Sequence, residues 1–142
     1  FSTKRACESI RASVPPVGWS KLVWHPVCIS KHAFCLWLAI LGALKTLDKL
    51  AHLGILPSAG CLFNYGDNEI VDHLLFACPY TQHIWTEILS KCNIHQHILA
   101  WSEEVQWMAD HERGNKLPQT SRKLAIGATV YHIWKERNRR SF

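Results

Sequence analysis

The 142-residue sequence lacks any apolar run long enough to span a membrane. Its longest apolar run, Ala33 to Leu44, is interrupted by Gly42 and is shorter than the roughly 20 residues that a membrane helix needs. The sequence also lacks a secretory signal, because no apolar segment follows its basic start. Without such a signal the six cysteines are not expected to form a disulfide framework. We therefore expect an intracellular protein of the nucleus or cytoplasm, with no membrane partner.

Acidic residues are scarce relative to basic ones. The 11 Asp and Glu face 16 Lys and Arg, so the formal net charge is +5 with the nine His counted as neutral. A surplus of this size weakly favours polyanions such as nucleic acid as partners. The hydrophobic share of 48% and the length suit one domain with a packed core. The chain starts at Phe1 and its single methionine is Met108, which we interpret as the sign of a fragment of a longer product.

Helical periodicity dominates the chain, and no stretch shows the strict alternation of a strand. Apolar residues recur three and four positions apart in segments that predict helices over about residues 19–24, 31–42, 47–53, 81–91, 102–114 and 119–139. In the second of these segments, the predicted core-facing stripe consists of Phe34, Trp37, Leu38 and Leu41, and Leu36 and Ile40 widen it. The predicted fold class is therefore all-α, with an irregular, knuckle-like loop around residues 58–80.

Composition shifts divide the chain into three parts. Residues 1–18 are polar and then rich in proline, so we predict a linker or the end of a preceding region. Residues 19–92 form the first helical domain, which includes the knuckle-like loop. Residues 93–142 form a C-terminal helical extension that ends in a basic run.

The stretch from Gly60 to Tyr80 holds the residues with metal chemistry. His73 lies on a short predicted helix and Cys78 just past its end, so both side chains can reach one point. Cys61, at the start of a turn, adds a third ligand. Zinc prefers Cys and His ligands in a tetrahedron. Three protein ligands with a water form a catalytic type of site, whereas four protein ligands form a structural one.

Asn64 stands where a Cys-x2-Cys pair would have its second cysteine, and an amide oxygen is a poorer match to zinc. Three interpretations stay open from the residues alone. The loop is metal-free with both cysteines in the core, or it is a zinc knuckle, or it is a zinc hydrolase site. For a hydrolase, Glu69 is the possible base, on the same helical face as His73. Asp72 either orients the imidazole or starts the short helix.

Two runs of residues and a tail carry a resemblance to a known family. They are Lys31-His32-Ala33-Phe34 followed by Trp37-Leu38, then Glu69-Ile70-Val71-Asp72-His73-Leu74-Leu75-Phe76-Ala77-Cys78-Pro79-Tyr80, and finally Val130 to Phe142. They resemble the zinc-binding domain that follows the polymerase in reverse transcriptases of plant non-LTR (LINE-type) retroelements. With their neighbouring residues, the matches cover most of residues 19–85 and 130–142.

The resemblance implies a zinc site at four positions and a role beside a polymerase. The ligand positions are Cys61, Asn64, His73 and Cys78, of which Asn64 departs from the family's Cys-Cys-His-Cys pattern. The domain over residues 19–92 would then be of the zinc-binding type. Its expected partners are nucleic acid, either RNA or DNA, and the polymerase region of the parent protein. The residues expected to contact nucleic acid are those of the basic run, Lys135, Arg137, Arg139 and Arg140.

The chain is not expected to be an enzyme by itself. A polymerase of this kind needs adjacent aspartates, whereas Asp48, Asp67, Asp72 and Asp110 stand apart. The alternative function is a metal-free helical domain that binds a protein or is purely structural, the remnant of an inactive element. Seven tryptophans supply apolar surface for such a role.

Overall fold

The computed structural model describes residues 17–63, 66–111, 114 and 116–141. Its helices are α2 (Ser20–Val23), α3 (Ser30–Ile40), α4 (Leu47–His52), the π-helix η1 (His73–Ala77), α5 (Pro79–Lys91), α6 (Trp101–His111) and α7 (Leu117–Ser141). Extended pairing within these residues is limited to one β-bridge, so the predicted all-α class is confirmed. None of the described helices is long and apolar enough to cross a membrane. The linker predicted over residues 1–18 lies almost wholly outside the described part.

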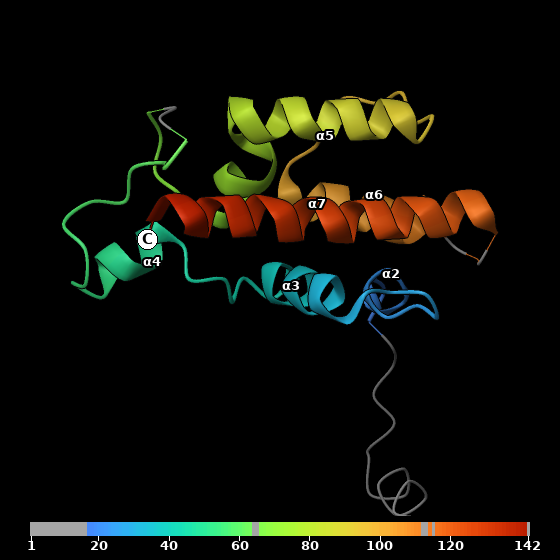
Figure 1. Cartoon of the computed structure of the whole chain (residues 1–142), viewed down its shortest axis with the longest axis horizontal. Coiled ribbons are helices and arrows are strands. Elements are labelled where there is room, and N and C mark those ends of the chain that lie inside the picture. The colour runs from blue at the N-terminus through green and yellow to red at the C-terminus, as the bar shows by residue number, and fades with distance from the viewer. Residues whose placement is uncertain (1–16, 64–65, 112–113, 115, 142) are drawn as a thin grey trace, which may run out of the picture.

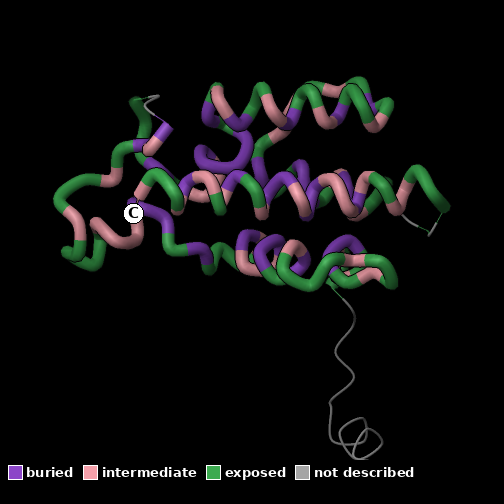
Figure 2. Tube along the Cα trace, viewed as in Figure 1, coloured by how far each residue is buried: buried purple, intermediate pink, exposed green. Residues whose placement is uncertain are grey.

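The long helix α7 runs through the middle of the fold, with α3 along one side and α5 along the other (Figure 1). Its buried face carries Ile126, Val130 and Ile133, which share one core with residues of α3, η1 and α5. In Figure 2 the buried residues, in purple, recur along α3, η1, α5 and α7. The predicted boundary at residue 92 falls between α5 and α6, and residues from both sides of it contribute to the core. Independent folding of residues 19–92 stays a prediction.

The structure corrects the predicted orientation of α3. Phe34 and Leu41 are exposed by 53% and 52%, whereas Leu36 and Ala39 are 1% exposed. The prediction that Phe34 and Leu41 face the core is therefore wrong. The helix is apolar on nearly all sides, so the periodicity does not distinguish its faces. Small residues such as Ala39 lie on the buried face and allow a close approach of neighbouring elements.

Candidate metal centre

A short hairpin positions Cys61. Gly60 and Asn68 form an antiparallel bridge, and the backbone N–H of Cys61 donates to the carbonyl oxygen of Asp67 at 2.8 Å. Gly66, on the returning side, has a φ of +77°, a conformation that residues with a side chain rarely adopt. The reversal of the chain thus depends on a glycine and places the Cys61 side chain in the core, with 7% exposure.

The π-helix η1 brings His73 and Cys78 to the same side. The N–H of Cys78 donates to the carbonyl oxygen of His73 at 2.7 Å, a hydrogen bond across five residues. In a regular α-helix, residues five apart point about 140° away from each other around the axis. The wider π turn removes most of this divergence, and such turns are frequent at functional sites. Pro79 then begins α5 directly after Cys78, where its missing N–H has no cost.

The three predicted ligands converge on one buried point. One ligand atom from each of Cys61, His73 and Cys78 lies within 4.8 Å of the other two. The two Sγ atoms are 3.9 Å apart, close to the separation of about 3.8 Å that two thiolates have on a tetrahedral zinc. His73 Nε2 is buried and has no hydrogen-bond partner in the described part of the chain. A buried nitrogen of this kind is expected to have a partner, so the residues fit a zinc ion. Asn64, the fourth predicted ligand, lies outside the described residues.

The protonation of the cysteines bears on metal binding. Burial raises the pKa of the Cys78 thiol, and the neighbouring Cys61 raises it further. The backbone N–H groups of Tyr80 and Thr81, at the start of α5, act in the opposite direction on this pKa. Zinc binds the thiolate, so binding must displace the proton that the raised pKa retains.

Of the two roles predicted for Asp72, the structure agrees with the helix start, because Asp72 directly precedes η1. Asp72 Oδ1 accepts a hydrogen bond of 2.6 Å from the backbone N–H of Trp101, so Asp72 stabilises the start of α6 instead of orienting the imidazole. Glu69 is fully buried and its Oε1 is held by Arg137 and by the backbone N–H of Leu47, an arrangement that favours a structural role over that of a hydrolytic base. Asp67, to which the sequence patterns assign no role at this site, lies with its Oδ2 3.7 Å from His73 Nδ1.

Glu69 joins the hairpin to the C-terminal helix. Its Oε1 accepts hydrogen bonds from Arg137 Nε at 2.8 Å and from the backbone N–H of Leu47 at 3.0 Å. The side chains of Arg137 and Glu69 are 3% and 0% exposed. Arg137 lies four residues after Ile133 and seven after Val130, on the buried face of α7. Its predicted role in contacting nucleic acid is therefore corrected, because a buried, paired guanidinium does not reach a phosphate.

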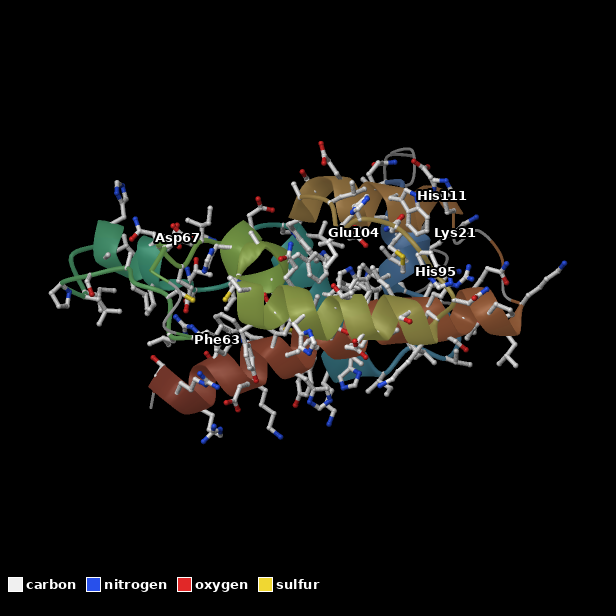
Figure 3. The ribbon with its side chains drawn as sticks, turned by 90° about the horizontal axis from the view of Figure 1, so that it is seen from above. Lys21, Phe63, Asp67, His95, Glu104 and His111 are labelled. Atoms are coloured by element: carbon white, nitrogen blue, oxygen red, sulfur yellow. The ribbon has the colours of Figure 1, made fainter. Side chains whose placement is uncertain are left out.

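Arg140 packs on the hairpin from the end of α7. Its guanidinium lies 4.8 Å from the ring centre of Phe63 and 5.2 Å from that of Tyr80. These two rings are stacked, with their centres 4.6 Å apart. Figure 3 labels Phe63 on the side of the hairpin next to the C-terminal part of α7, and Asp67 on the side away from it. The hairpin that carries Cys61 is thus held against α7.

The remaining basic residues of the run stay at the surface. Glu136 pairs with both Arg139 and Arg140, and these hydrogen bonds lower its pKa to about 2. Arg139 is nevertheless 71% exposed, and Lys135 is exposed. Together with His132, Lys135 and Arg139 line one wall of a groove of about 700 Å³ between α7 and α5. This wall carries the accessible positive charge of the predicted run.

Two cysteines and one histidine that meet in the core of a small helical fold are a set of donors of the kind that binds zinc. The family model described as zinc-binding in reverse transcriptase matches residues 1–85. The chain belongs to this family, whose members are accessory and not catalytic domains. None of the curated proteins and none of the solved structures matches the chain. The family match ends within α5, so α6 and α7 lie beyond it.

Proposed function

We propose that the chain is a zinc-stabilised accessory domain of a reverse transcriptase that binds nucleic acid beside the polymerase. The observation that carries this proposal is the convergence of Cys61, His73 and Cys78 in the segment that the family model covers. The three residues are 7%, 5% and 0% exposed. Such burial favours a structural zinc over a catalytic one, which keeps a coordination position open to water and substrate.

The zinc would stabilise the surface that contacts nucleic acid. Its ligand Cys61 lies on the hairpin that holds α7 through Glu69 and Phe63. The accessible cations Lys135 and Arg139 lie on the same end of α7, beside His132. A polyanion bound there would release counterions, and its affinity would fall steeply as salt rises.

We also infer a plant non-LTR (LINE-type) element as the origin of the chain. The run from Glu69 to Tyr80 and the tail from Val130 to Phe142 support this inference. The polymerase region of the same protein would then be a partner, in the nucleus or cytoplasm. Sequencing of the genomic locus tests the origin, because a polymerase reading frame should precede the coding segment. A locus without any polymerase remnant would contradict it.

The metal content of the purified chain tests the zinc site. Elemental mass spectrometry of the parent chain is expected to find about one zinc per chain, with three protein ligands and a fourth from solvent or position 64. Cys61→Ser should lose this zinc, and Asn64→Cys should bind it more tightly. Zinc in Asn64→Cys alone would identify the native chain as a metal-free remnant. The absence of zinc from both the parent chain and Asn64→Cys would contradict the ligand assignment.

Salt-dependent binding tests the nucleic-acid surface. Fluorescence anisotropy with labelled single-stranded DNA, RNA and duplex is expected to show affinities that fall strongly between about 50 and 200 mM salt. Lys135→Ala and Arg139→Ala should each reduce the slope of log affinity against log salt by roughly 1. Lys116→Ala, at the other end of α7, is the matched control and should leave the slope unchanged. Equal slopes in all variants would contradict this surface.

A second candidate function is protein interaction, which the exposed face of α3 favours. Phe34 and Leu41 are exposed by 53% and 52%, and Trp24 on the preceding loop by 49%. Apolar surface of this kind is typical of interfaces. If the polymerase region of the parent protein covers it, a Phe34→Ser/Leu41→Ser variant should lose co-purification with that region and keep its zinc.

A further inference from the structure

We infer that Asp67 positions His73 for zinc, so that Nδ1 donates its hydrogen to the Asp67 carboxylate and Nε2 binds the metal. This inference rests on the proposed zinc site and extends it by one residue. It assigns a positioning role to an acid that the ligand pattern does not include. It also selects one of the two imidazole nitrogens as the ligand.

The hairpin places Asp67 beside the metal ligands. Cys61 and Asp67 are direct cross-strand neighbours, because the bridge next to them pairs Gly60 with Asn68. Residues that face each other across an antiparallel pair project their side chains from the same face. The hairpin therefore presents a thiol ligand and a carboxylate on one side. The Asp67 side chain is 79% exposed and the His73 side chain 6%, so the carboxylate lies at the outer edge of the site.

The two nitrogens of His73 have different surroundings. Nε2 is buried without a hydrogen-bond partner, whereas Nδ1 lies 3.7 Å from Asp67 Oδ2. This distance exceeds a normal hydrogen bond by roughly 0.5–1 Å, which a small rotation of the ring or of the exposed carboxylate would close. A neutral imidazole carries its hydrogen on one nitrogen only. A carboxylate at Nδ1 favours the hydrogen there, and this leaves the lone pair of Nε2 for the metal.

The other acids close to His73 in the sequence are engaged elsewhere. Asp72 accepts the backbone N–H of Trp101, and Glu69 pairs with Arg137. Among the described residues, Asp67 is thus the acid whose carboxylate lies next to the His73 ring, 3.7 Å from Nδ1. Since metal-bound histidines usually donate their second N–H to an oxygen acceptor, Asp67 is placed to supply that acceptor at His73 Nδ1.

Zinc affinity in the full chain tests the role of Asp67. Competition with a chromophoric chelator is expected to show about 10- to 100-fold weaker zinc binding in Asp67→Ala, the range found when such a carboxylate is removed. Asp67→Asn keeps an acceptor oxygen without the charge, so its zinc affinity should lie between that of the parent chain and that of Asp67→Ala. Asp72→Asn is the matched control, since it is adjacent to His73 but caps α6. It should lower thermal stability and leave zinc affinity unchanged.

Nitrogen NMR of His73 separates a positioning role from a general loss of structure. In the zinc-bound parent chain, Nε2 should show the shift of a metal-bound nitrogen and Nδ1 that of an N–H. In the metal-free chain, Asp67→Ala should reduce the share of the tautomer with hydrogen on Nδ1, and Asp72→Asn should not. Zinc on Nδ1, direct coordination by Asp67, or unchanged affinity in Asp67→Ala would each overturn the inference. A parent chain without zinc would instead contradict the proposed function.

Discussion

Arg137→Ala is expected to destabilise the fold strongly, although the residue lies in a basic run near the end of a helix. The guanidinium donates to Glu69 Oε1 at 2.8 Å, and both side chains are almost wholly inaccessible to water. Removal of one partner leaves the Glu69 carboxylate buried without its counter-charge, which costs about 3–5 kcal/mol. For a domain of this size, the cost corresponds to a fall in Tm of roughly 10–15 °C.

Urea unfolding of the zinc-saturated protein, followed by circular dichroism, measures this loss. Arg139→Ala is the matched control, with the same substitution two residues further along α7. Its ion pair with Glu136 is 71% exposed on the arginine side, so its loss should leave the free energy of unfolding nearly unchanged. If Arg137→Ala unfolds the chain, Glu69→Gln/Arg137→Met keeps the acceptor for Leu47 and removes both charges. This double variant should fold and recover much of the loss.

Equal unfolding free energies for Arg137→Ala and Arg139→Ala would refute this reasoning. They would mean that water or another group compensates the Glu69 charge. A second observation would also count against it. If Arg137→Ala changed the salt slope of nucleic-acid binding without changing stability, Arg137 would be a surface contact and not a buried anchor.

Three further expectations follow from charges and packing. Glu136→Gln should bind single-stranded nucleic acid more tightly at low salt, because the substitution removes the carboxylate that pairs with Arg139 and Arg140. Fluorescence anisotropy measures the affinity, and an unchanged affinity would place the binding surface elsewhere. Zinc affinity should rise from about pH 6 to pH 8, because the raised pKa of Cys78 keeps the thiol protonated and zinc must displace that proton. A zinc affinity that does not change with pH in chelator competition would contradict this expectation. Leu74→Ala truncates a residue with 0% exposure and should lower the free energy of unfolding by about 2–5 kcal/mol. Urea titration measures this loss, and a loss below about 1 kcal/mol would show that neighbouring core residues fill the space.

Local features of the site were predictable because they depend on residues close in sequence. The apolar repeats indicated most of the helices, and the pattern of Cys61, His73 and Cys78 indicated the candidate metal ligands whose side chains the structure brings together. In the predicted stripe on α3, Leu36 is buried and Trp37 and Leu38 pack against the core, but Phe34 and Leu41 are exposed for a physical reason. A helix that is apolar on most sides has no periodic signal to show which face its neighbours cover.

For charged residues as well, local sequence does not show which side chain finds a buried partner. In the sequence, Arg137 and Arg139 belong to one basic run, and only the helical spacing of Arg137 from Val130 and Ile133 sets it apart. Their difference depends on Glu69, which lies 68 residues away from Arg137 and is brought to it only by the fold. Asp67 was missed because its relation to His73 requires the hairpin register, whereas Asp72 is adjacent in sequence and is used elsewhere.

The sequence by itself therefore determined the helical class, the chemical nature of the metal ligands and the family. These properties follow from residue types at fixed spacings, which act over one or two turns of chain. The tertiary structure decided which face of α3 is buried, which arginine becomes an internal ion pair and which aspartate contacts the histidine. Those outcomes depend on desolvation and on partners distant in the chain, and local spacing carries no information about either.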